Sequence, residues 1–152
     1  MIKKLFLYTV CLLPWFLGNL FPLDYDYYNE IIKPSFAPPT YFYAIAWSII
    51  YLLTAYTIYS IISSYKIKDI PKSYKISLLV NYLFNQGYTL VFFGLKSHFL
   101  GFVFCLGTFI SCLLLYEETS LLQNKKKYYL LPYIGLSIFA VILSLSIYVL
   151  NI

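Results

Sequence analysis

Three side-chain amides lie together in the middle of an otherwise apolar stretch of the sequence. Asn81, Asn85 and Gln86 occur within NYLFNQGYTLVFF, and Tyr88 and Phe92 follow on the same helical face as the two asparagines. An amide at membrane depth is costly unless it has a hydrogen-bond partner, so these side chains must face protein or a cavity. Two interpretations stay open: interhelical hydrogen bonds that hold a helix bundle together, or the polar floor of a ligand pocket.

A second apolar stretch supplies aromatic side chains at the same helical spacing. Trp47, Tyr51 and Thr54 recur at i, i+4 and i+7, so they share one face of a helix. A pocket with this aromatic wall and an amide floor would fit a large planar or sterol-like ligand that carries a few polar groups. The candidate ligand-binding residues are Phe36, Pro38, Pro39, Trp47, Tyr51, Asn81, Asn85, Gln86, Tyr88 and Phe92.

No catalytic or metal-binding pattern accompanies these residues. The chain has three cysteines without a CxxC pair and a single histidine, and Asp69, Glu117 and Glu118 lie among lysines at the ends of apolar runs. None of the apolar stretches carries an ionisable residue at its centre, which argues against ion-coupled transport. We therefore expect a binding protein with no catalytic residue, no metal and no required cofactor.

The elements that must position these side chains are membrane-spanning helices. Of 152 residues, 61% are hydrophobic and 11% are charged, against about 25% charged residues in soluble domains. Five apolar segments approach the roughly 20 residues that a helix needs to cross a bilayer. They are Leu5–Phe21, Tyr41–Ser64, Tyr74–Phe93, Phe99–Tyr116 and Tyr128–Leu150. This pattern predicts an all-α integral membrane protein, a single domain over residues 1–152 that forms a bundle of five transmembrane helices.

The lysines predict the orientation of this bundle. Nine of the eleven basic residues lie in the N-terminus and the second and fourth connections, whereas only Lys33 and Lys96 lie on the other side. Such a split is typical of five spans with a cytoplasmic N-terminus, and it accounts for the net charge of +5 without a nucleic-acid partner. The first segment could instead be a cleaved signal peptide, but no small-residue cleavage motif follows it, so we interpret it as a span.

The connection over residues 22–40 is unusual in its prolines. Pro34, Pro38 and Pro39 fix φ and remove amide donors, which predicts that no helix begins before Pro39 and that residues 24–38 form a stiff, non-helical loop. The loop has more aromatic residues than a solvated linker needs. They form either an interfacial aromatic belt or a lid over an opening between the helices.

The stretch KPSFAPP followed by AWSIIY resembles the KPSWxPP…W..LY signature of the TspO/MBR family, the tryptophan-rich sensory protein or translocator protein family. Further stretches agree in order, namely LFPLDYDYYNEI, NYLFNQGYTLVFFG and LLPYIGLSIFA. The resemblance implies a five-helix membrane protein, a homodimer, that binds porphyrins and other tetrapyrroles or sterols. It implies a lid in the first connection and a pocket in the aromatic and amide cluster, with Pro34, Pro38, Pro39, Trp47, Tyr51, Asn85 and Pro132 at family positions.

The sequence departs from the family pattern at several aromatic positions. Phe36, Tyr88 and Leu136 stand where relatives have tryptophan, and Phe104 stands where many have aspartate. Some bacterial relatives break down porphyrin in light through pocket tryptophans, an activity that Leu136 cannot support. We therefore expect a prokaryotic plasma-membrane sensor or translocator that binds a tetrapyrrole such as protoporphyrin IX. The alternatives are a porphyrin-degrading enzyme, a small-molecule transporter, or a purely structural role for the amides.

Overall fold

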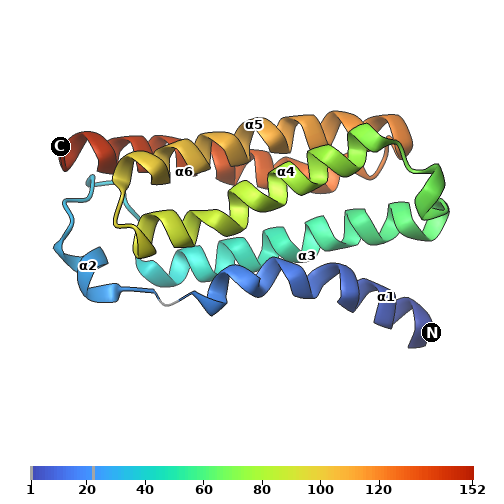
Figure 1. Cartoon of the computed structure of the whole chain (residues 1–152), viewed down its shortest axis with the longest axis horizontal. Helices are drawn as coiled ribbons and strands as arrows, with labels where there is room; N and C mark the ends of the chain where they lie inside the picture. The colour runs from blue at the N-terminus through green and yellow to red at the C-terminus, as the bar shows by residue number, and fades with distance from the viewer. Residues whose placement is uncertain (1, 22) are drawn as a thin grey trace.

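The computed structural model describes residues 2–21 and 23–152, so Met1 and Pro22, which begin the predicted domain and the predicted loop, lie outside the described residues. Within these residues the chain is helical and contains no β-strand, as the sequence predicts. The long helices run side by side and alternate in direction, and α2 lies at the end of the molecule that also holds the C-terminus (Figure 1). The helices are α1 (Ile2–Leu12), α2 (Tyr25–Glu30), α3 (Thr40–Ser64), α4 (Lys72–Thr89), α5 (His98–Leu122) and α6 (Leu131–Leu150).

Three of the described helices are long and apolar enough to cross a membrane, judged by length and composition. They cover Thr40–Ser64, His98–Leu122 and Lys127–Leu150, the last of which includes a 3-10 turn at Lys127–Leu130 before α6. The other two predicted spans are less clear, because α1 has only 11 residues and α4 is much less apolar than the three. The chain therefore has the apolar helices of a membrane protein, while the count of five spans stays a prediction.

The first predicted span is divided by Pro14. Proline lacks an amide donor and its ring crowds the preceding turn, so α1 ends at Leu12 and a 3-10 segment follows at Leu13–Leu20. This segment buries Trp15, which is 2% exposed. It also approaches α4 closely, because the amide of Gly18 donates to Oε1 of Gln86 at 2.6 Å.

At the contact between α4 and α5, aromatic rings of one helix pack onto glycines of the other. A Cβ added to Gly87 would lie 2.5 Å from the ring of Phe104, and one added to Gly107 would lie 2.5 Å from the ring of Phe84. The two rings meet edge to face with their centroids 5.4 Å apart. Small residues that admit a neighbouring side chain are a common means of close helix packing in membranes.

The first connection contains a helix that the prolines do not predict. Residues Tyr25–Glu30 form α2, and the carboxylate of Asp24 accepts a hydrogen bond from the amide of Tyr27 at 2.9 Å as its N-cap. The prediction that residues 24–38 are non-helical was therefore wrong for this turn, because an aspartate cap can start a helix upstream of the prolines. Downstream the prediction is confirmed, since α3 begins at Thr40 and Pro39 occupies its N-cap position.

The α4 helix ends in a wide turn that turns its last side chains toward the bundle. Residues Leu90–Gly94 form a π-helical segment, in which the amide of Leu95 donates to the carbonyl of Leu90. Such segments insert an extra residue into a helical turn and often occur at functional sites. Within this segment Phe92 is 1% exposed and packs in an apolar cluster with Leu143 and Ile147, whereas Leu90 is 44% exposed.

Candidate ligand cavity

A cavity of about 510 Å³ lies between α3, α4, α5 and α6 and is bounded on one side by the first connection. Its volume falls within the usual range of ligand pockets, about 300–1,000 Å³. The described residues that line it are Phe16, Leu23, Tyr28, Thr40, Tyr41, Tyr43, Ala44, Trp47, Ser48, Tyr51, Asn85, Tyr88, Thr89, Phe93, Cys105, Thr108, Ser137, Ala140, Leu143 and Ile147. The wall is thus mainly aromatic and aliphatic, with scattered hydroxyls and one amide.

An aromatic column supports the α3 side of the wall. Trp47 lies against Tyr51 with ring centroids 6.0 Å apart, and Tyr51 lies against Trp15 at 5.7 Å. Phe16 adds an edge-to-face contact to Tyr51 at 5.5 Å. Aromatic rings in such arrangements stabilise one another beyond simple burial. Trp47 and Tyr51 both line the cavity, and Trp15 and Phe16 of the 3-10 segment pack behind or beside the Tyr51 ring.

The amides of α4 are joined by a hydrogen-bonded chain across the bundle. Asn85 accepts from the hydroxyl of Tyr51 at 3.0 Å and from Nε2 of Gln86 at 2.8 Å, and its own Nδ2 donates to the hydroxyl of Tyr133 at 3.0 Å. That hydroxyl donates in turn to Oδ1 of Asn81 at 3.0 Å. Every link connects residues of different helices, except the one between Asn85 and Gln86.

The remaining amide atoms also find partners. Nδ2 of Asn81 donates to the carbonyl of Thr108 at 3.1 Å and to the hydroxyl of Ser111 at 3.0 Å, both on α5. Gln86 binds the first segment through the amide of Gly18 and the carbonyl of Trp15. Asn81 and Gln86 therefore act mainly as interhelical links, whereas Asn85 both links helices and lines the cavity. Both interpretations of the amides find support here, in different residues.

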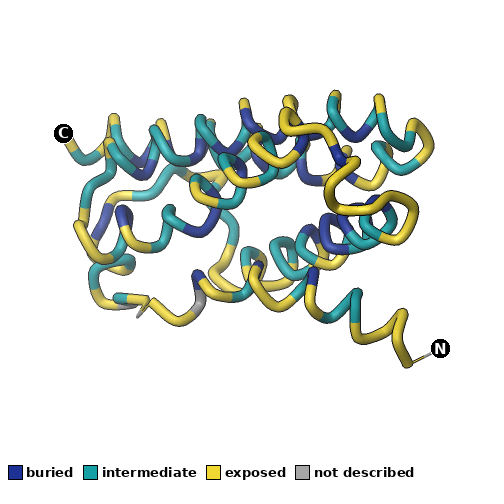
Figure 2. The backbone as a smooth tube through the Cα atoms, turned by 45° about the vertical axis from the view of Figure 1, so that its right-hand side comes forward, coloured by how far each residue is buried: buried dark blue, intermediate teal, exposed yellow. Residues whose placement is uncertain are grey.

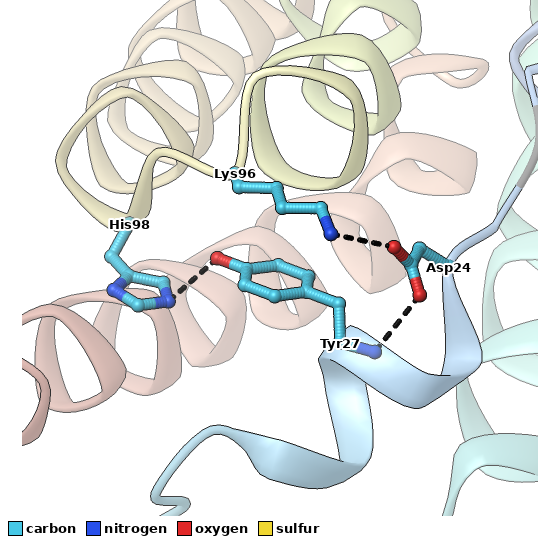
Figure 3. A network of polar contacts seen from close by, with 4 residues as sticks. All are labelled: Asp24, Tyr27, Lys96 and His98. Carbon is cyan, nitrogen blue, oxygen red and sulfur yellow. Dashed lines mark hydrogen bonds and ion pairs between the residues drawn. The ribbon is translucent and has the colours of Figure 1, made fainter.

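The first connection is fastened over one end of the bundle by a polar cluster, which Figure 3 shows from close by. Lys96, in the turn between α4 and α5, forms an ion pair with Asp24 at 2.9 Å, and the hydroxyl of Tyr27 lies 2.7 Å from Nε2 of His98. The Tyr27 and His98 rings are stacked, 5° from parallel. We call these four residues the latch.

The pKa shifts of the latch residues favour the protonation states that its contacts require. The hydrogen bond from Lys96 holds the pKa of Asp24 below its ordinary value, and the same contact raises the pKa of Lys96. Burial raises the pKa of Tyr27, so this phenol stays protonated. Each shift favours the form found in the latch, namely a carboxylate, an ammonium and a neutral phenol.

A second fastening lies at the C-terminal end of α6. The side chain of Asn151 accepts from the amide of Ile32 at 2.9 Å and donates to its carbonyl at 2.8 Å. Ile31 is buried beside Phe92, Leu143 and Ile147, in an apolar cluster that the connection covers. The first connection is thus held at two ends, and two of its residues, Leu23 and Tyr28, line the cavity. We call residues 23–39 of this connection the lid; that they act as one stays a prediction.

The predicted site residues fall into three groups. Trp47, Tyr51, Asn85 and Tyr88 line the cavity together. Asn81, Gln86 and Phe92 lie behind the wall, where they support it. The third group lies outside the wall and comprises Phe36, Pro38 and Pro39.

Phe36 is 48% exposed and meets Phe139 edge to face at 6.4 Å. It belongs to the outer surface of the lid. Leu136, at the position where relatives have tryptophan, packs with the apolar core around Tyr133. It is likewise outside the described cavity wall.

The sequence analysis did not predict the roles of two residues, Tyr133 and Trp15. Tyr133 is fully buried and connects Asn85 to Asn81, but one tyrosine among 18 in an apolar chain carries no distinguishing signal. Trp15 could have been found, because it is one of only two tryptophans and follows a helix-breaking proline. Such a pairing indicates a packed, irregular segment rather than a uniform lipid-facing helix.

The described wall of the cavity is poor in charged groups. None of its described lining residues is an acid, a lysine or a histidine. Among the described residues, no three histidine, cysteine or acidic side chains cluster in a way that could hold a metal ion. The wall offers aromatic rings, aliphatic side chains, hydroxyls, the thiol of Cys105 and the amide of Asn85.

Comparison with known proteins gives a consistent assignment. The sequence model of the TspO/MBR family matches residues 7–150. The tryptophan-rich protein TspO of Bacillus cereus is 36% identical over 132 residues, which cover 87% of this chain and 85% of that protein. The membrane protein YtaB of Bacillus subtilis, described as uncharacterized, is 30% identical over 88% of this chain and 86% of its own length. A tryptophan-rich protein TspO of Chlorobaculum tepidum is 24% identical over 93% of this chain and 91% of its own length. The chain therefore belongs to the TspO/MBR family.

Proposed function

We propose that this integral membrane protein is a receptor that binds a tetrapyrrole, or a similarly large and flat apolar molecule, in the cavity under the lid. The observation that carries the proposal is the cavity of about 510 Å³ whose mainly aromatic and aliphatic wall includes Trp47 and Tyr51. Burial of apolar ligand surface against such a wall supplies affinity without any charged group. The hydroxyls and Asn85 supply orientation.

The proposal includes five membrane spans, with the N-terminus on the cytoplasmic side of a bacterial plasma membrane. Support for α4 as a span comes from its outer face, where Ile76, Leu79 and Leu83 are each at least 50% exposed. Their spacing places them on one stripe, and buried residues lie on the inner sides of the helices (Figure 2). A helix with an apolar outer stripe and amides inside suits a position between lipid and protein.

The α1 helix and the 3-10 segment that follows it also expose apolar side chains. Leu5, Phe6, Leu13 and Leu17 are 49–69% exposed, although α1 and the following 3-10 segment pack on α3 and α4 at Trp15. Exposed apolar side chains of this number are unfavourable in water but ordinary in lipid. The homodimer that the family resemblance implies stays a prediction, and the cavity lies within one chain, so binding needs no second copy.

Binding is proposed in preference to turnover because the described wall offers no acid–base pair. Leucine also stands at position 136, where relatives have a tryptophan, so this chain lacks that indole for light-dependent breakdown of a porphyrin. A protein that binds and releases such a ligand past the lid could sense, buffer or transfer it.

The test is a titration of the purified protein with protoporphyrin IX, followed by intrinsic fluorescence. The chain has two tryptophans, so Trp15 remains as a reporter when Trp47 is removed. We expect micromolar affinity in the parent protein and weaker binding in Trp47→Ala and Asn85→Ala. Leu121→Ala, an 82% exposed position far along α5, serves as the matched control and should titrate like the parent. Unchanged affinity in both site variants would exclude this cavity as the binding site.

A further inference from the structure

Two phenolic hydroxyls at the lid end of the cavity have no hydrogen-bond partner among the described residues. They belong to Tyr28, on α2 of the lid, and Tyr43, in the first turn of α3. Both oxygens are buried, and both side chains line the cavity. Buried polar groups almost always have a hydrogen-bond partner, so two neighbouring hydroxyls without one need an explanation.

The surroundings of these hydroxyls make their isolation costly. Both rings pack against the apolar cluster that contains Phe92, Leu143 and Ile147. The two hydroxyls are neighbours, yet they do not form a hydrogen bond of acceptable geometry. Even if they did, two phenols hold two O–H donors and a bond between them uses only one. At least one donor therefore stays without an acceptor among the described residues, in a side chain that lines the cavity.

A positive charge lies beside this pair. The ammonium of Lys33 sits 4.4 Å from the centroid of the Tyr28 ring and donates to the backbone carbonyl of Tyr28 at 2.5 Å. A cation over a phenol ring is attracted by the ring face, and it also favours a negatively charged atom near the hydroxyl. The inner end of the cavity differs, because there the amides are largely occupied by protein partners.

We propose that the Tyr28–Tyr43 hydroxyl pair binds a carboxylate of the ligand, held at the lid while the apolar ring lies deeper against Trp47 and Tyr51. This inference rests on the proposed function and narrows it. It selects a flat molecule that carries an acid group, such as a tetrapyrrole with free propionates, over a neutral sterol-like molecule. Two O–H donors and a nearby cation match the lone pairs and charge of a carboxylate.

The experiment compares two ligands that differ only in this group, protoporphyrin IX and its dimethyl ester. The variant is Tyr28→Phe/Tyr43→Phe, which keeps both rings and removes both hydroxyls. The matched control is Tyr128→Phe, because Tyr128 is 57% exposed and lies outside the described cavity wall, so this variant removes a phenolic hydroxyl away from the site. Dissociation constants are measured for each protein with each ligand.

The variant should bind the diacid about tenfold more weakly than the parent does, since charge-assisted hydrogen bonds are lost. Its affinity for the diester should stay within about twofold of the parent value, and Tyr128→Phe should match the parent with both ligands. The thermal midpoint of the ligand-free variant should be equal to or above that of the parent, because no internal hydrogen bond is broken.

Two results would overturn the inference while leaving the proposed function intact. One is an unchanged affinity of the double variant for the diacid. The other is an equal loss of affinity for diacid and diester, which would make the two tyrosines general wall residues. A parent protein that binds neither ligand would instead contradict the proposed function itself, and this inference with it.

Discussion

Removal of the Tyr133 hydroxyl is the sharpest test of the hydrogen-bonded chain beneath the cavity. Tyr133 is fully buried, accepts from Asn85 and donates to Asn81, with both distances 3.0 Å. The substitution Tyr133→Phe keeps the ring but leaves an amide donor on Asn85 and an amide oxygen on Asn81 without these partners. The structure shows no alternative partner for either atom among the described side chains.

The expected magnitude follows from the two broken bonds. A buried hydrogen bond contributes about 1 kcal/mol net, with a further cost for the group left unpaired, while measured values in a membrane helix bundle average about 0.6 kcal/mol. Tyr133→Phe should therefore lower the free energy of unfolding by about 1–3 kcal/mol. The matched control, Tyr51→Phe, removes one bond to an Asn85 oxygen that still accepts from Gln86, and should cost less.

The assay is chemical unfolding of each purified variant in detergent micelles, with the parent measured alongside. The order of stability should be parent, then Tyr51→Phe, then Tyr133→Phe. A Tyr133→Phe protein as stable as the parent, or more stable than Tyr51→Phe, would refute the reasoning that this hydroxyl joins α6 to α4.

Two further predictions concern packing and the latch. Gly107→Ala should destabilise the protein by about 1–3 kcal/mol in a thermal or chemical melt, because its Cβ would meet the Phe84 ring at 2.5 Å. Gly135→Ala meets nothing within 4 Å and should be neutral or stabilising; equal effects of the two would contradict the packing. For the latch, the pKa of Asp24 is lowered and that of Lys96 is raised, from ordinary values of 3.8 and 10.5. The ion pair therefore contributes between those values, and is lost as pH falls through the lowered pKa or rises through the raised one. The rates of ligand association and dissociation, measured by stopped-flow, should rise at such pH extremes and in Lys96→Ala at pH 7. If Lys96→Ala had the same rates as the parent, the latch would not control ligand entry.

Helical periodicity was enough to predict the inner face of α4. Amides in a long apolar helix have one tolerable environment, so Asn81 and Asn85 had to face protein, and aromatic residues at the same spacing had to accompany them. The same reasoning applied to Trp47 and Tyr51 on α3. Four of the predicted residues line the cavity for this reason, because a helix fixes the direction of a side chain from its position alone.

The structure of the lid could not be predicted fully, because it depends on contacts between residues that are far apart in the sequence. Proline patterns correctly placed the start of α3, but the short α2 depends on a cap at Asp24 and on packing against residues near His98. Phe36 lies outside the cavity wall for a similar reason. Its ring contacts Phe139 of α6, a residue far away in the sequence, and local sequence does not encode such a contact.

Blocking the cavity is the most direct test of the account. Ala140 lines the cavity from α6, whereas Ile142, two residues on, is 52% exposed on the outer side. Ala140→Phe fills the cavity and Ile142→Phe adds a ring of the same size outside it. Protoporphyrin IX should bind Ile142→Phe as tightly as the parent and should bind Ala140→Phe at least about tenfold more weakly, provided that both variants melt near the parent temperature. Equal affinity of a folded Ala140→Phe protein and the parent would contradict the claim that the ligand lies between the helices.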